Sequence, residues 1–175
     1  MGLGDYFNLP RLLRTAALFA LGMLAIYIEA APFGLGAAAL PSPDLLLCVV
    51  CFWAARRPGS TPMVLIFALG LVRDLLTDVP VGAGVLALVL VSEVVKGWRH
   101  HLARAGFALE WTAFAAVAIA ASAIPWVLVI LTFAQPPYLI DLGYQIAHTV
   151  LVYPLVVLIL RWLLGISWRK PELAT

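Results

Sequence analysis

The chain has 175 residues, of which 64% are hydrophobic and only 11% are charged, and its mean hydropathy is +1.04. A soluble domain carries about 25% charged residues, so this composition excludes an ordinary soluble globule and indicates an integral membrane protein. The formal net charge of +2 is too small to suggest a nucleic-acid partner, so the positions of the basic residues matter more than their sum.

Six apolar stretches come close to the roughly 20 residues that a helix needs to cross the hydrocarbon core of a bilayer. In chain order, we expect transmembrane helices over about residues 12–31, 43–55, 61–77, 79–97, 107–134 and 139–164. The second stretch is too short to cross alone, so we expect the preceding GLGAAAL to enter the membrane with irregular backbone, packed on protein. The sequence therefore predicts an all-α integral membrane protein in which residues 1–175 form a single six-helix transmembrane domain.

The basic residues predict the orientation of these spans, because short cytoplasmic loops of membrane proteins hold Lys and Arg in excess. All but one of them fall on one side of the expected bilayer: Arg11, Arg14, Arg56, Arg57, Lys96, Arg99, Arg104, Arg161, Arg169 and Lys170. The loops on the opposite side carry only acidic charges: Glu29, Asp44, Asp78 and Asp141. We therefore expect both ends of the chain on the cytoplasmic side.

Arg73 and Asp74 are unusual because they lie inside the third expected span. With Thr61 as N-cap and Pro62 as first helical residue, a rise of about 1.5 Å per residue places both in the outer third of the membrane. A charge at the centre of a span costs about 2.5–3.5 kcal/mol, so retaining both implies partners or water. Two interpretations stay open. In the first, Arg73 extends outward to the membrane interface and Asp74 caps the TDVPVGAG turn through backbone N–H groups. In the second, Asp74 fixes that turn as a rigid site for another protein or a small ligand.

A polar seam is expected on the sixth span, where Tyr144, Gln145 and His148 share one helix face because they are three and four residues apart. A histidine without a facing carboxylate on its own helix is more often an interhelical hydrogen-bonding group, and we interpret His148 in this way. A proton relay, and with it a proton-coupled transporter, would depend on His148 and Asp74 alone.

The sequence contains no G-x-S-x-G, no H-E-x-x-H, no phosphate-binding glycine loop and no dense acidic cluster. Cys48 and Cys51 form a C-x-x-C, but they lie inside an apolar run, where hydrocarbon disfavours the thiolates that a redox or zinc site needs. We interpret them as two buried apolar side chains. We therefore expect a protein that is not an enzyme, with no catalytic residue, metal or cofactor.

The fifth span contains AFAAVAIAASAIP, in which small residues recur before Pro125. Small residues let helix backbones approach closely, so we expect this span to pack against another helix of this chain or of a partner. Pro125 and Pro154 are expected to kink their helices.

From Pro43 to about Gly97, the chain resembles the family of the rod shape-determining protein MreD. The pattern runs from Pro43-Asp44 through Phe52-Trp53, Arg57-Pro58, Phe67, Gly70 and Asp74-Leu75 to Pro80, Gly82 and Leu86. It covers about a third of the chain, and the first and the last two spans match only in hydropathy. The residues that we expect to shape the fold or to bind a partner are Pro43, Asp44, Gly70, Arg73, Asp74, Pro80 and Gly82, although Arg73 has no assigned place in the family pattern.

The resemblance implies a non-catalytic scaffold subunit of the bacterial cell-elongation complex in the cytoplasmic (inner) membrane. Its relatives bind MreC, a single-span protein with a periplasmic domain, and so connect the MreB filament to the peptidoglycan polymerase and transpeptidase of side-wall synthesis. The MreC helix would dock on an apolar or small-residue face, for which the fifth span is our candidate.

An alternative function follows from the same resemblance, because the MreD family is itself similar to the substrate-binding membrane subunits of energy-coupling-factor transporters. Such a subunit would bind a vitamin-like small molecule in a pocket opening near Asp74 and Asp78. A pocket of this kind needs aromatic and hydrogen-bonding side chains, and the expected outer loops supply few of them. We therefore favour the scaffold.

Overall fold

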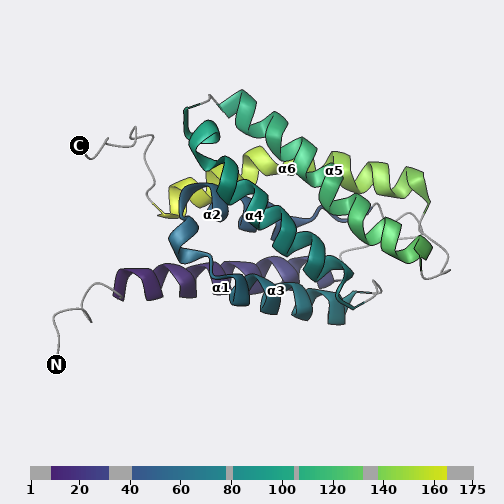
Figure 1. The fold of residues 1–175 in the computed structure, drawn as a ribbon, viewed down its shortest axis with the longest axis horizontal. Helices are drawn as coiled ribbons and strands as arrows, with labels where there is room; N and C mark the ends of the chain where they lie inside the picture. The colour runs from purple at the N-terminus through teal and green to yellow at the C-terminus, as the bar shows by residue number, and fades with distance from the viewer. Residues whose placement is uncertain (1–8, 32–40, 78–80, 105–106, 132–137, 165–175) are drawn as a thin grey trace.

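The computed structural model describes residues 9–31, 41–77, 81–104, 107–131 and 138–164, and within these ranges it contains helices and no strand (Figure 1). The elements in chain order are α1 (Leu9–Ala30), α2 (Leu45–Arg56), the 3₁₀ turn η2 (Pro58–Ser60), α3 (Met63–Leu76), α4 (Ala83–Arg104), α5 (Phe107–Leu131) and α6 (Leu139–Leu164). The expectation of an all-helical chain is confirmed for these residues.

Three of the described helices are long and apolar enough to span a membrane: α1 over Arg11–Ala30, α5 over Phe107–Leu131 and α6 over Leu139–Leu163. Much of their apolar surface faces outward, since only 22% of each spanning window is buried within the protein. Outward apolar surface on helices of this length is what a lipid environment requires. The chain therefore has the character of a helical membrane protein.

The helices form a bundle with α2 and α4 at its centre (Figure 1). The buried α2 packs against α1, α4 and α6, and α4 also packs against α3 and α5. In Figure 1, α1 and α3 run side by side along one flank, and α5 and α6 lie along the other. The beginning of α1 and the end of α6 lie at the same end of the bundle.

The short helix α2 is buried because it is apolar on every face. Each residue from Leu46 to Ala54 is buried, including Trp53 and both cysteines. Its 12 residues extend about 18 Å, well short of the hydrocarbon thickness of about 30 Å. The expectation that Cys48 and Cys51 act as small buried apolar side chains is confirmed, since both thiols are free and enclosed.

The boundaries of two expected helices were wrong. Thr61 does not cap α3: its hydroxyl donates to the Pro58 carbonyl at 2.8 Å, within a turn that the sequence did not indicate, and α3 begins at Met63. The helix expected over 79–97 is α4, which begins only at Ala83 and continues to Arg104. The GLGAAAL segment and Pro80 lie outside the described residues.

The two prolines expected to kink helices lie inside continuous helices, Pro125 in α5 and Pro154 in α6. The alanine-rich part of α5 does pack against neighbours in this chain, as expected. Its buried residues Phe114, Ala118 and Ala121 follow helical spacing, and α5 contacts α4 and α6.

Candidate functional site

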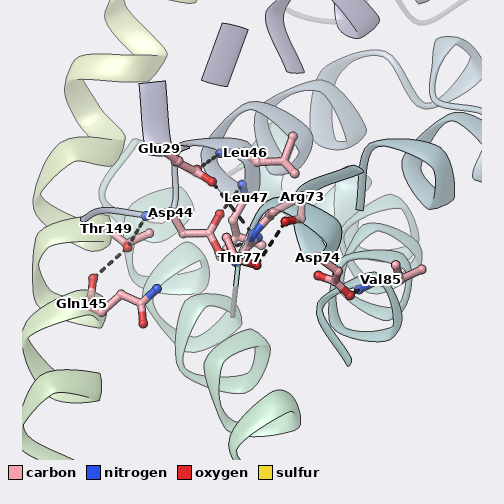
Figure 2. A network of polar contacts seen from close by, with 10 residues as sticks. All are labelled: Glu29, Asp44, Leu46, Leu47, Arg73, Asp74, Thr77, Val85, Gln145 and Thr149. Carbon is pink, nitrogen blue, oxygen red and sulfur yellow. Dashed lines mark hydrogen bonds and ion pairs between the residues drawn. The ribbon is translucent and has the colours of Figure 1, made fainter. Parts of the chain in front are cut away.

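Arg73 lies at the centre of a buried charge cluster near the end of α3 (Figure 2). Its Nη1 is 2.9 Å from Asp44 Oδ2, and its Nε is 3.9 Å from Glu29 Oε2. The side chains are 18%, 13% and 9% exposed for Arg73, Asp44 and Glu29, so the charges are held largely away from solvent. The interpretation that Arg73 extends outward to the interface was wrong, because two carboxylates from other parts of the bundle hold it inside.

The two carboxylates of this cluster also cap the first turn of α2. Asp44 is the N-cap residue, and its Oδ1 accepts a hydrogen bond from the Leu47 N–H at 2.8 Å. Glu29 Oε1 accepts from the Leu46 N–H at 2.8 Å. The N–H groups in the first turn of a helix have no hydrogen-bond partner within that helix, so the two carboxylates supply one. The positive end of the helix dipole also favours the negative charges of Asp44 and Glu29. One buried helix end thus explains why two acids are tolerated beside one arginine.

Thr149 connects this cluster to α6. The Asp44 backbone N–H donates to Thr149 Oγ1 at 2.9 Å, and the Thr149 hydroxyl donates to the Gln145 carbonyl at 2.7 Å. Figure 2 shows this chain of contacts running from α6 to Arg73. The cluster therefore fixes the end of α1, the start of α2, the end of α3 and the middle of α6 relative to one another.

Asp74 points to a different neighbour from Arg73, as its position one residue along the helix requires (Figure 2). Its Oδ2 accepts hydrogen bonds from the backbone N–H groups of Gly82 at 2.9 Å and Val85 at 3.1 Å, and Asp74 is 2% exposed. These amides lie at the start of α4, so the carboxylate offsets the positive end of that helix dipole. The expectation that Asp74 caps the turn between the third and fourth spans is confirmed.

Gly70 and Gly84 allow the close approach of α3 and α4, and Gly82 allows the turn before α4. Gly82 has a φ of +99°, a backbone conformation that favours glycine. A Cβ added to Gly84 would collide with the Asp74 carboxylate, and one added to Gly70 would lie 3.0 Å from the Val85 Cα. The expected motif residues Asp44, Gly70, Asp74 and Gly82 are therefore structural in this fold, each serving a helix end or a helix contact.

A second buried cluster joins α2, α5 and α6 at the opposite end of α2. Arg56 forms two parallel hydrogen bonds with Glu110, from Nη1 to Oε1 at 2.7 Å and from Nη2 to Oε2 at 2.8 Å. The Tyr153 hydroxyl donates to the same Oε1 at 3.0 Å, and its ring stacks on Phe114 with centroids 3.7 Å apart. This bidentate geometry is the strongest form of an arginine–carboxylate pair. The cluster locks the three helices together.

The polar seam of α6 contacts the segment before α2. His148 Nδ1 lies 3.1 Å from the Pro41 carbonyl oxygen, and the His148 and Tyr144 rings stack with centroids 6.5 Å apart. Gln145 contributes its backbone carbonyl to Thr149. His148 thus makes the contact to another part of the bundle that we expected, and the structure brings the seam close to the Asp44 capping site through Thr149.

The described residues contain no group of three His, Cys, Asp or Glu side chains arranged to hold a metal ion. A cavity of about 20 Å³, lined by Cys51, Trp98, Glu110 and Tyr153 among others, has room for about one water molecule. Each carboxylate of the two clusters already has a cation or a backbone amide as partner. These contacts join helices to one another.

Four residues of the clusters were missed as site residues by the sequence interpretation: Glu29, Arg56, Glu110 and Thr149. A glutamate in the first turn of a long apolar helix is the signal that could have identified Glu110, since an intramembrane charge implies a partner. Nothing in the sequence pairs it with Arg56, which is 54 positions away.

No family model matches the chain, and no curated protein or solved structure matches it either.

Proposed function

We propose that this protein is a non-catalytic, six-span membrane scaffold of the MreD kind, which binds MreC and supports side-wall peptidoglycan synthesis and cell shape. In this arrangement, the end of the bundle that carries Arg14 and Arg57 faces the cytoplasm, and the end that carries Glu29 and Asp44 faces the periplasm. The short helices α2 and α3 would then lie in the bilayer as parts of the bundle. Neighbouring helices enclose α2, whereas α3 keeps an apolar face that includes Val64 and Leu75 outward.

The observation that supports this proposal best is the shared role of the motif residues. Asp44 caps α2, Gly70 allows α4 to approach α3, and Asp74 caps α4. Residues that are separated in the sequence thus build one connected framework around a buried helix. Members of one family can differ in their loops and outer faces and still keep the residues that build a shared framework. The resemblance to the MreD family is carried by residues of this kind.

The alternative, a vitamin-like uptake subunit, has less support. Near the outer end, the described carboxylates of Glu29, Asp44 and Asp74 are used as helix caps and do not face a pocket. We retain the scaffold as the proposed function.

The docking face for MreC is proposed on α5. Its inward face carries Ala118 and Ala121, while Ala116 and Ala120 are exposed on the outside, four residues apart. Two small residues at this spacing let a second helix approach closely. The membrane helix of MreC would pack along this outer face.

The test is copurification of MreC with the tagged full-length protein from the source membrane in mild detergent. We expect MreC to be recovered with the unmodified chain and to be reduced severalfold by Ala116→Leu or Ala120→Leu. Ala20→Leu, at an exposed position of α1, is the matched control and is expected to leave recovery unchanged. Failure to recover MreC with the unmodified chain would refute the proposed function.

The orientation has a separate test. Single cysteines placed at the exposed positions Arg14 and Asp141 should react with a membrane-impermeant thiol reagent from opposite sides of a sealed vesicle. Reaction of both from the same side would refute the six-span arrangement.

A further inference from the structure

Four arginines line one hollow at the end of the bundle where α1 begins. The hollow has a volume of about 430 Å³ and is lined by Arg11 and Arg14 of α1, by Arg56 and Arg57 at the end of α2, and by Gly59 and Ser60 of η2. Its size falls in the range of small-molecule sites. Because α1 is a membrane-spanning candidate from Arg11 onward, the hollow lies at the level of the lipid headgroups.

The hollow holds excess positive charge. The charge of Arg56 is compensated by the bidentate pair with Glu110. Within the described part of the chain, no ion pair is formed by Arg11, Arg14 or Arg57. Partial burial and the nearby charge of Arg14 lower the pKa of Arg57. Like charges that face a common space repel one another, so an anion in the hollow would be favourable.

The segments that carry these arginines are held together by contacts between packed elements. The Thr15 hydroxyl lies 3.4 Å from the Ser60 carbonyl, which joins α1 to η2. The Arg57 N–H donates to the Trp53 carbonyl at 2.7 Å and so closes the last turn of α2. The Arg11 guanidinium lies beside Gly59: its Nη2 would be 3.7 Å from a Cβ added to that glycine. Cytoplasmic loops of membrane proteins generally hold an excess of basic residues, but that tendency can be met by charges that are far apart. It does not explain why residues of α1, α2 and η2 line one hollow.

We propose that this hollow binds a phosphate group, and specifically the headgroup phosphate of an anionic phospholipid. The planar guanidinium group presents paired N–H donors that match two oxygens of a phosphate. Three arginines that form no ion pair with the described residues select a headgroup with net negative charge over a zwitterionic one. This inference is independent of the proposed scaffold function, because it rests on the arginines that line the hollow and not on any protein partner.

The experiment measures lipid retention by native mass spectrometry of the full-length protein in a non-ionic detergent, where no charged membrane surface contributes. The probes are phosphatidylglycerol and phosphatidylcholine, added at equal concentrations. We expect phosphatidylglycerol to bind at least fivefold more tightly than phosphatidylcholine. Arg14→Gln and Arg57→Gln should each weaken phosphatidylglycerol binding about fivefold, the contribution typical of one basic residue near an anionic lipid surface.

The matched control is Arg99→Gln, which removes the same charge from α4 outside the lining of the hollow. We expect a change below about twofold for this variant. Equal weakening by Arg99→Gln and Arg57→Gln would show a diffuse basic surface and overturn the proposal. Equal binding of the two lipids would also overturn it. Monodisperse elution of each variant ensures that weaker binding does not reflect unfolding.

A competition arm distinguishes the two sources of phosphate. If the lipid is the natural ligand, inorganic phosphate at millimolar concentration should leave phosphatidylglycerol bound. Displacement by inorganic phosphate, abolished in Arg57→Gln, would support a phosphate site that serves a soluble anion and would overturn the lipid assignment.

Discussion

Replacement of Arg73 by leucine tests the central charge cluster. The change removes the cation between Asp44 and Glu29 and leaves two carboxylates in surroundings where they are 13% and 9% exposed. Removing one partner of a buried ion pair typically destabilises a protein by about 3–5 kcal/mol, because the remaining charge is uncompensated. The two backbone N–H groups bound by the carboxylates offset only part of this loss. We therefore expect Arg73→Leu to lower the free energy of unfolding by about 3–5 kcal/mol.

The pair between Lys96 and Glu93 provides the comparison. Its N–O distance of 2.8 Å matches the Arg73–Asp44 distance of 2.9 Å, but the Glu93 side chain is 52% exposed. Exposed pairs contribute about 0.2–1 kcal/mol, so Glu93→Gln should cost no more than that. Burial, and not distance, then sets the difference between the two variants.

A compensating variant separates charge from packing. In Arg73→Leu combined with Glu29→Gln and Asp44→Asn, the amide oxygens can still accept from the N–H groups of Leu46 and Leu47, and asparagine caps a helix about as well as aspartate. We expect most of the lost stability to return. The assay is equilibrium unfolding in mixed detergent micelles with increasing sodium dodecyl sulfate, followed by circular dichroism. A loss below about 1 kcal/mol for Arg73→Leu, or no recovery in the triple variant, would refute the reasoning.

Three further outcomes are expected in the same unfolding assay or by thiol labelling. Gly84→Ala should cost about 1–3 kcal/mol, because its Cβ displaces the carboxylate of Asp74 from the start of α4, and a cost near zero would contradict the capping role. Tyr153→Phe should cost about 1.5–3 kcal/mol, since it removes the hydroxyl donated to the ionised Glu110 but keeps the ring. The two buried cysteines of α2 should react with a maleimide only after unfolding, and rapid labelling of the native protein would place α2 at the surface.

Hydropathy in the sequence determined the helical membrane character, because a bilayer leaves few ways to satisfy the backbone of a long apolar chain other than a helix. Local chemistry left two roles open for Asp74, a cap of the following turn or a rigid binding site, and the structure shows the capping contacts with the N–H groups of Gly82 and Val85. Burial of the two cysteines likewise followed from the apolar run that surrounds them.

The partners of the buried charges were decided only by the tertiary structure. Arg73 meets Asp44 and Glu29, and Arg56 meets Glu110 54 positions away, because helix packing brings together side chains whose sequence separation carries no periodic signal. The position of α2 at the centre of the bundle was also hidden: its length indicated an incomplete crossing, but only the neighbours that enclose it explain why so short a helix is stable. Packing decides which buried charges depend on one another, because removing one partner leaves the other as an uncompensated charge in a site that excludes water.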